Sequence, residues 1–237
     1  DELFVYTPDF ELITSYRSPY LKHCHEICRY ERRLFLTSTG FDSILGFDLD
    51  NNRFSMGLYL TKRDEQIAAV NYDPNDKRGP DAGNQFHLNS VYCDSRGMFI
   101  SGLRTEFLLV YGGRKIERVA AVPAGVHNAR PFRDGIVFND TEADVVRFVA
   151  PDKQRIFKIP RYPDEQLSHK DEDDMRVARQ AFGRGLCAVN NHAIATGSSP
   201  STITVHDLEG MQSTQSINLT MDVRNAIHGL EVWPYSV

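Results

Sequence analysis

The 237-residue chain has no long hydrophobic run, no excess of positive charge and few cysteines. No apolar stretch approaches the roughly 18 residues that a helix needs to cross a bilayer. The formal net charge of −5 argues against a nucleic-acid partner, because phosphate binding usually needs a basic face. We therefore expect neither a membrane nor a nucleic acid among the partners of this protein.

The cysteines show neither the spacing of a disulfide framework nor that of a zinc knuckle. They are Cys24, Cys28, Cys93 and Cys187. Reduced, buried thiols in a cytoplasmic protein are the expected arrangement. A composition of 41% hydrophobic and 25% charged residues predicts a globular protein, which we expect to be one domain over residues 1–237. The first residue is Asp1 rather than Met, which is compatible with a processed or trimmed N-terminus and with a removed signal peptide.

What the chain does contain is an internal repeat. Five six-residue segments, which we call openings, can be aligned so that the first position is His or Arg and the sixth is aromatic or Val. They are HEICRY from His25, HLNSVY from His87, HNARPF from His127, RGLCAV from Arg184 and HGLEVW from His228. The residues at the first position are called the histidine column. After four of these openings, a second and a third run follow that are rich in Val, Ile, Phe and Thr. The third run of the first unit begins at Asp42. In two other units it begins at Asp144 and at Ser201, at the same distance in sequence from the first residue of the opening. The pattern therefore predicts that each unit is a small antiparallel sheet.

Repeated sheets of roughly 40 to 60 residues are typical of a β-propeller, so we predict an all-β fold with five blades. The N-terminal segment ELFVYTPDFELITSY has no opening before it. The C-terminal segment HGLEVWPYSV, from His228, is an opening that no second or third run follows. We expect these two ends to pair in one blade and to close the ring. The second strand of that blade has no visible source in the sequence, and we expect residues upstream of Asp1 to have been removed or to be disordered.

Two long connections interrupt the repeat, at residues 71–84 and 162–183. The second contains an acidic stretch leading into a helical pattern. Its carboxylates at Asp171–Asp174 are consecutive rather than alternating as in a calcium loop, so we interpret them as a solvated helix start. Both connections directly precede an opening, which predicts that they lie over the same face as the histidine column and contribute to binding.

The histidine column predicts a metal site. In a propeller the first strand of each blade lines the central channel, so His25, His87, His127 and His228 would converge at one mouth of it. Four imidazoles in a ring leave axial positions open, which favours iron(II), with copper, nickel, manganese or zinc as alternatives. The competing interpretation is that these histidines are scaffold residues that bond the backbone of their neighbours.

Arg184 occupies the first position of the remaining opening. Its guanidinium cannot bind a metal because it stays positively charged. A guanidinium there would hold the carboxylate or phosphate of a small anionic substrate. Glu26, next to His25, is the candidate that would orient an imidazole N–H, or alternatively the partner of Arg184. No GxSxG, P-loop or GxGxxG motif occurs in a suitable context.

The order HEI…TSTGFDSILGFD, FHLNSV, VHNARPF…ND and RGLC resembles a family of uncharacterised bacterial β-propeller proteins. Its members carry HDL…NTRFSCLATLD, CHLNG, PHSPR and RGL at similar places, and the resemblance runs from about Leu21 to Trp233. It is most specific at HLN (87–89) and at His127. The resemblance implies the propeller fold and the histidines but no reaction. The four-histidine site itself is similar to that of carotenoid-cleaving oxygenases, which are larger, seven-bladed propellers.

Three hypotheses about function follow. The first is a metal-dependent enzyme, specifically a non-haem iron oxygenase that acts on a small anion. The second is a metal-dependent hydrolase or lyase of the propeller-lactonase type, although the chain offers few carboxylate and amide groups at the ring. The third is a propeller that binds a ligand or partner without chemistry.

Overall fold

The computed structural model describes residues 1–64, 66–170 and 179–234. Its strands run from β1 to β19, and the described residues contain one short 3₁₀ helix, η1 (Asp164–Gln166), and no α-helix. The predicted all-β class is confirmed. No helix in the described ranges has the length and apolar character needed to cross a membrane. The helix start predicted at Asp171–Asp174 lies outside the described residues.

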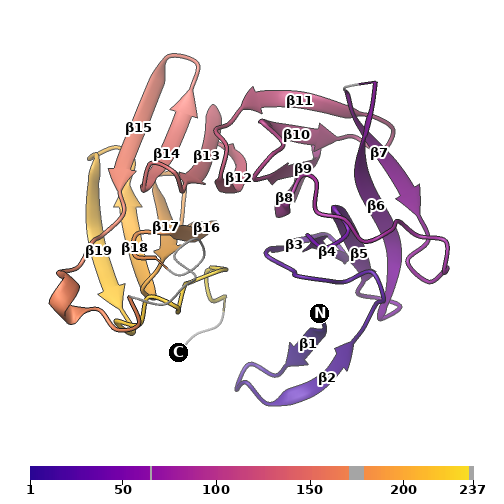
Figure 1. Ribbon diagram of the computed structural model, residues 1–237, viewed down its shortest axis with the longest axis horizontal. Coiled ribbons are helices and arrows are strands. Elements are labelled where there is room, and N and C mark those ends of the chain that lie inside the picture. The colour runs from indigo at the N-terminus through magenta and orange to yellow at the C-terminus, as the bar shows by residue number, and fades with distance from the viewer. Residues whose placement is uncertain (65, 171–178, 235–237) are drawn as a thin grey trace. The chain divides into compact units, whose positions relative to one another are not determined.

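The described strands form five antiparallel sheets, in which strands adjacent in sequence are adjacent in the sheet (Figure 1). The chain divides into two compact units, one of residues 1–122 with the chain end from Trp233, the other of Pro123–Val232. The first unit holds β1 (Leu3–Tyr6), β2 (Leu12–Tyr16), β3 (Ile27–Tyr30), β4 (Arg33–Ser38), β5 (Ser43–Asp48), β6 (Arg53–Arg63), β7 (Gln66–Tyr72), β8 (Leu88–Asp94), β9 (Gly97–Gly102), β10 (Phe107–Tyr111) and β11 (Ile116–Ala121). The second holds β12 (Val126–Phe132), β13 (Gly135–Asp140), β14 (Val145–Ala150), β15 (Lys153–Lys158), η1, β16 (Gly183–Ala188), β17 (Ala193–Ser198), β18 (Thr202–Asp207) and β19 (Gln212–Asn218).

In the first unit, the central strands are apolar on both faces because both faces are covered. Side chains alternate between the two faces of a strand. On β5, Ile44 belongs to the core shared with the β8–β11 sheet, and its neighbour Leu45 belongs to a second core that includes Leu3 of β1. Strands covered on both faces need continuous apolar runs such as SILGF. A sheet with one solvent-exposed face would instead show apolar and polar residues alternating along each strand.

The second unit repeats this arrangement with two four-stranded sheets, β12–β15 and β16–β19. Val137 and Val146 of the first sheet share one buried core with Leu186 and Ile194 of the second. All four side chains are at most 1% exposed. Burial of side chains of this size stabilises the folded state by about 1.5–3 kcal/mol each, so the facing sheets hold the unit together.

The predicted runs after the openings are confirmed as strands, and the turn residues Asp42, Glu106 and Asp144 all have positive φ, as tight connections often require. The predicted strand at HGLEVW is wrong over the described residues 228–234, which form no strand. The preceding residue, Ile227, instead donates its N–H to the carbonyl of Ser198 at 3.4 Å, at the end of β17. The number of blades and the closure of the ring stay predictions.

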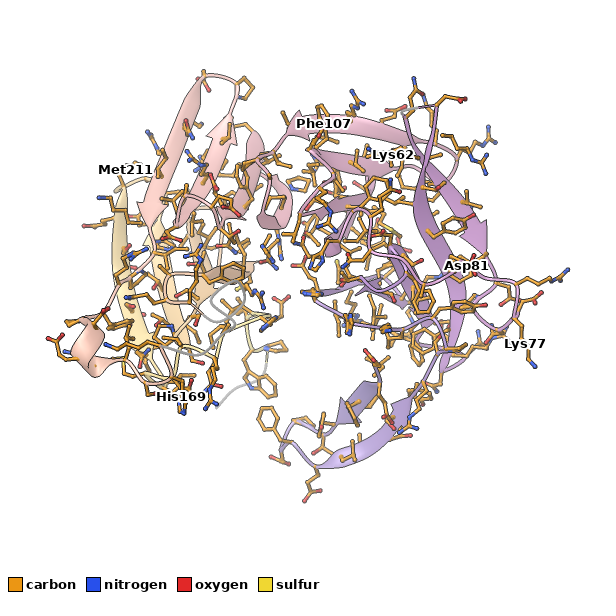
Figure 2. All side chains as sticks on the ribbon, viewed as in Figure 1. Lys62, Lys77, Asp81, Phe107, His169 and Met211 are labelled. Atoms are coloured by element: carbon orange, nitrogen blue, oxygen red, sulfur yellow. The ribbon has the colours of Figure 1, made fainter. Side chains whose placement is uncertain are left out.

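The first long connection joins β7 to β8 and carries Lys77 and Asp81, which project outward from the ribbon in Figure 2. Gly83 of this loop donates its N–H to the carbonyl of Gly40 at 2.9 Å, in the turn between β4 and β5. This turn is at the end of the sheet where β3 begins, and the placement of both connections over the face of the histidine column stays a prediction.

One buried histidine gives the fold a specific pH dependence. His206 of β18 is fully buried, and its Nε2 and Nδ1 atoms lie 2.9 Å and 3.0 Å from the hydroxyls of Thr196 and Ser213. Burial lowers the pKa of His206 to about 4. Between about pH 6.5 and pH 4, His206 is therefore protonated in the unfolded chain but neutral in the folded chain.

We predict that this difference removes about 3 kcal/mol of the free energy of unfolding between pH 6.5 and pH 4. Urea unfolding of the wild type and of His206→Gln at a series of pH values measures it, and the variant should show a shallower decline. His192→Gln, at an exposed site, serves as the control and should keep the wild-type slope. Equal slopes in all three proteins would contradict the assignment.

Candidate functional site

The residues of the predicted column lie where strands begin. His25 shortly precedes β3, His87 directly precedes β8, and His127 is the second residue of β12. Arg184 is the second residue of β16. These four residues therefore lie at or near the start of the first strand of a sheet, and their assignment as blade starts stays a prediction. His228 opens no strand in the described part of the chain.

In the first unit, His25 and His87 lie together with their ring centroids 5.3 Å apart in an edge-to-face arrangement. Nδ1 of His25 is 2.8 Å from the carbonyl oxygen of His23 and 2.9 Å from the hydroxyl of Thr39. A carbonyl oxygen can only accept a hydrogen bond, so Nδ1 carries the proton of the neutral ring. The lone pair of His25 is therefore on Nε2, the atom that can bind a ligand.

A buried carboxylate fixes the chain just before His87. Asp42 is 4% exposed and accepts the backbone N–H of Phe86 at 3.1 Å and that of Gln85 in a shorter bond. Burial raises the pKa of Asp42, against the lowering effect of these amides. The carboxylate thus joins the β4–β5 turn to the start of the next sheet and sets the position of His87.

Glu26 is buried beside His25, and one of its carboxylate oxygens accepts the backbone N–H of Val91 at 3.0 Å. The Nδ1 atom of His25 bonds to the carbonyl of His23 and to Thr39, so these groups orient that ring. The bond from Val91 ties β8 to the segment that precedes β3. The role predicted for Glu26, orienting an imidazole, stays a prediction.

In the second unit, His127 shows the same local bond as His25. Its Nδ1 lies 3.0 Å from the carbonyl of Gly125, two residues earlier, and Thr141 donates its hydroxyl to the same carbonyl at 2.5 Å. His127 is buried, and its ring meets that of Phe182 edge to face at 5.5 Å. The lone pair of the neutral His127 ring is therefore on Nε2.

Arg184 is 9% exposed and lies over the ring of Phe182, with the guanidinium carbon 4.4 Å from the ring centroid. Burial lowers the pKa of Arg184 to about 10, so the group is still charged at neutral pH. Its Nε atom is buried without a hydrogen-bond partner. Within residues 1–64, 66–170 and 179–234, no carboxylate forms an ion pair with it. A buried cation of this kind is unusual, because buried charges are normally paired.

His228 contacts Arg184 directly. Nη1 of Arg184 lies 2.9 Å from Nε2 of His228. A guanidinium has only donors, so Nε2 accepts the bond and its lone pair is used. A metal ligand would need that same lone pair, so in this arrangement His228 cannot also coordinate an ion through Nε2. The structure pairs the two residues, which the sequence analysis had assigned to separate roles.

Among the described residues, no group of three or more His, Cys, Asp or Glu side chains is arranged to hold a metal ion. The four-histidine set therefore stays a prediction, supported by one close pair, His25 with His87. Sequence reasoning missed Phe182, whose ring contacts both His127 and Arg184. Phe182 stands two positions before Arg184, whereas the position two before His87 is Gln85, so no repeated aromatic position marked Phe182 in the sequence.

No protein-family model matches the chain, and no curated protein matches it in sequence. In structure it is similar to the WD40 β-propeller domain of Doa1, at a TM-score of 0.51 and 12% identity, over 84% of this chain and 70% of that one. Apo AztD from Citrobacter koseri matches at a TM-score of 0.48 and 11% identity, over 90% of this chain and 64% of that one. The likeness to the Doa1 domain shows the fold alone, a β-propeller. The resemblance to an uncharacterised bacterial family stays a prediction.

The anchor at Asp42 is open to a direct test. Asp42→Ala leaves two backbone N–H groups without their acceptor in a buried site, which should lower the free energy of unfolding by about 1–3 kcal/mol. Urea unfolding measures the change. The control is Asp50→Ala, which removes an exposed ion pair with Arg32 and should cost about 0.5 kcal/mol or less. Equal losses in the two variants would show that Asp42 is no anchor.

Proposed function

We propose that this β-propeller binds a small anion at Arg184. The observation that supports the proposal is that Arg184, a residue 9% exposed, has no carboxylate paired to its guanidinium among the described residues. Removing a charge from water costs several kcal/mol unless an opposite charge or good hydrogen bonds replace the lost hydration. A carboxylate or phosphate from solution would supply both.

Described neighbours of Arg184 hold one end of the guanidinium and cover one of its faces. His228 holds Nη1, and the Phe182 ring covers one face. Nε has no partner, and no hydrogen bond to Nη2 is formed within the described residues. Nε and Nη2 together form the planar fork that binds two oxygens of a carboxylate or phosphate at once. We infer that the anion occupies this side.

The test is thermal unfolding of the full chain in inorganic phosphate and in chloride at equal ionic strength and pH. Phosphate should raise the melting temperature of the wild type, because a ligand that binds only the folded state stabilises it. Arg184→Met should lose this response. It should also melt at or above the wild type in chloride, because it removes a buried charge that lacks an anion. Arg184→Lys should bind phosphate roughly tenfold more weakly, since it lacks the two-pronged donor.

Arg78→Met is the matched control, because Arg78 is an exposed arginine paired with Asp76 in a loop of the first unit. It should keep the full phosphate response. If phosphate has the same effect on the wild type and on Arg184→Met, the proposal is wrong. If Arg184→Met instead melts far below the wild type in chloride, Arg184 is a structural residue.

A second candidate function, metal binding, is supported by the histidine pair. His25 and His87 have ring centroids at 5.3 Å, and both His25 and His127 keep the lone pair on Nε2 through a bond from Nδ1 to a backbone carbonyl. This second bond is typical of metal-ligating histidines. The more specific hypothesis, an iron(II) oxygenase acting on the anion, rests on a retained metal, and we derive no reaction step through one.

Elemental analysis of the purified full chain tests this candidate. If the protein retains iron or another divalent metal, His25→Ala and His87→Ala should each lower the content at least severalfold. His192→Ala should not, because His192 is exposed and pairs with Glu209. His206 is unsuitable as a control because its ring is a buried part of the fold. Equal metal content in wild type and both variants, or none in any, would contradict the assignment.

A further inference from the structure

Two cysteines that are distant in sequence lie together in the first unit. Cys28 is on β3 and Cys93 is on β8, strands of neighbouring sheets. The backbone N–H of Cys93 donates to Sγ of Cys28 at 3.3 Å, between residues 65 positions apart. Cys93 is 7% exposed, and Cys28 is half-buried against the same core. No disulfide joins any of the four cysteines, all of which are described.

The two thiols also contact each other. The hydrogen bond with Cys28 and burial together raise the pKa of Cys93, so Cys93 keeps its proton. The sulfur of Cys28 accepts the backbone N–H of Cys93, and its own thiol donates to the carbonyl of Arg29 at 3.8 Å. The thiolate is the nucleophilic form of cysteine, and a hydrogen bond donated to the sulfur stabilises it once the thiol has lost its proton.

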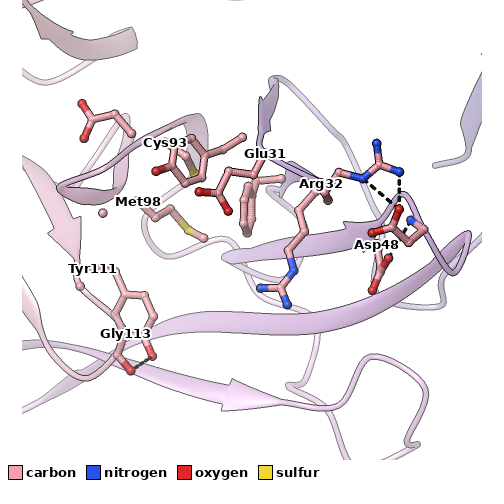
Figure 3. A pocket seen from close by; sticks show the side chains of 14 residues that line it. Glu31, Arg32, Asp48, Cys93, Met98, Tyr111 and Gly113 are labelled. Carbon is pink, nitrogen blue, oxygen red and sulfur yellow. Dashed lines mark hydrogen bonds and ion pairs between the residues drawn. The ribbon is translucent and has the colours of Figure 1, made fainter.

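A cavity of about 500 Å³ is lined by Cys93, one of the two cysteines (Figure 3). Cys93 and Met98 of the second sheet form part of its wall, and Tyr30, two residues after Cys28 on β3, lines it as well. Glu31 and Arg33 bring charges of both signs. The volume is in the range of small-molecule sites, roughly 300–1,000 Å³. A small zwitterionic molecule therefore has room beside Cys93, whose backbone N–H bonds to the sulfur of Cys28.

We propose that Cys28 and Cys93 form a dithiol site that exchanges with a low-molecular-weight disulfide of the peptide type in this cavity. The Cys28 thiol gives up its proton and its sulfur attacks one sulfur of the small disulfide, which breaks that S–S bond and releases one small thiolate. Cys93 then gives up its proton and attacks the Cys28 sulfur, which releases the second. The two protein thiols are oxidised to one disulfide, the small disulfide is reduced to two thiols, and the two protons pass to the released thiolates.

The other two cysteines lack this arrangement. The Cys24 thiol donates to the carbonyl of Glu26 at 3.5 Å, and burial raises the pKa of Cys24 to about 11. Cys187 is 3% exposed in the second unit, and burial raises its pKa too. Both should remain thiols under conditions that oxidise Cys28 and Cys93. They therefore provide internal controls on the same chain.

The test treats the folded full chain with oxidised glutathione at neutral pH and measures its mass and its peptides. The wild type should lose two of its four thiols and about 2 Da, with Cys28 and Cys93 linked in one peptide pair. Cys93→Ser should stop at the mixed disulfide on Cys28 and gain one glutathione. Cys24→Ser should behave as the wild type. The linked form should melt at a higher temperature, because the bond closes a long loop of the unfolded chain.

Retention of all four thiols, or a linkage that involves Cys24 or Cys187, would overturn the proposal. The mass measurement is made on wild-type protein, so a folding defect in either variant does not affect it. This site is separate from Arg184 and does not depend on the function proposed above. Exchange with glutathione that is equally fast in Cys28→Ser would also overturn it, because the first attack would then come from another residue.

Discussion

A carboxylate in the turn between the second and third strands of a sheet fixes where the next sheet begins. In the first unit, Asp42 accepts backbone N–H groups of Gln85 and Phe86. In the second unit, Asp144 occupies the corresponding turn, also with positive φ, and accepts a hydrogen bond from Arg179 at 2.6 Å. Each of these bonds pins the segment that leads into the following first strand.

The candidate sites follow from these anchors. His87 comes directly after the segment held by Asp42, and Phe182 and Arg184 follow shortly after Arg179. The guanidinium of Arg179 also lies over the Phe182 ring, 5.2 Å from its centroid. Phe182 therefore has two cationic neighbours, of which Arg179 is paired with a carboxylate. Arg184 has no such pair, and this difference leads to the proposal of an external anion.

Much of the architecture could be predicted from the repeat, because the column residues and the apolar runs have a local cause in strand pairing and burial. The lack of a strand at described residues 228–234 could not be predicted, because the pattern does not show whether a free strand edge is available to that segment. Ile227 packs against Gly197 of β17, where an added Cβ on the glycine would lie 2.5 Å from the isoleucine side chain. The hydrogen bond between Arg184 and His228 could not be predicted from the repeat either. Residues of one sequence column were expected to be equivalent, and the structure makes these two a donor and an acceptor.

The central claim is that Arg184 takes its counter-ion from solution. The most direct measurement is anomalous diffraction at the selenium edge from crystals of the full chain grown with selenate, a tetrahedral dianion like sulfate. The account predicts an anomalous peak with oxygens about 3 Å from Nε or Nη2 of Arg184, while His228 keeps Nη1. A carboxylate of the chain itself bonded to Arg184, with no selenium at this position, would contradict the account.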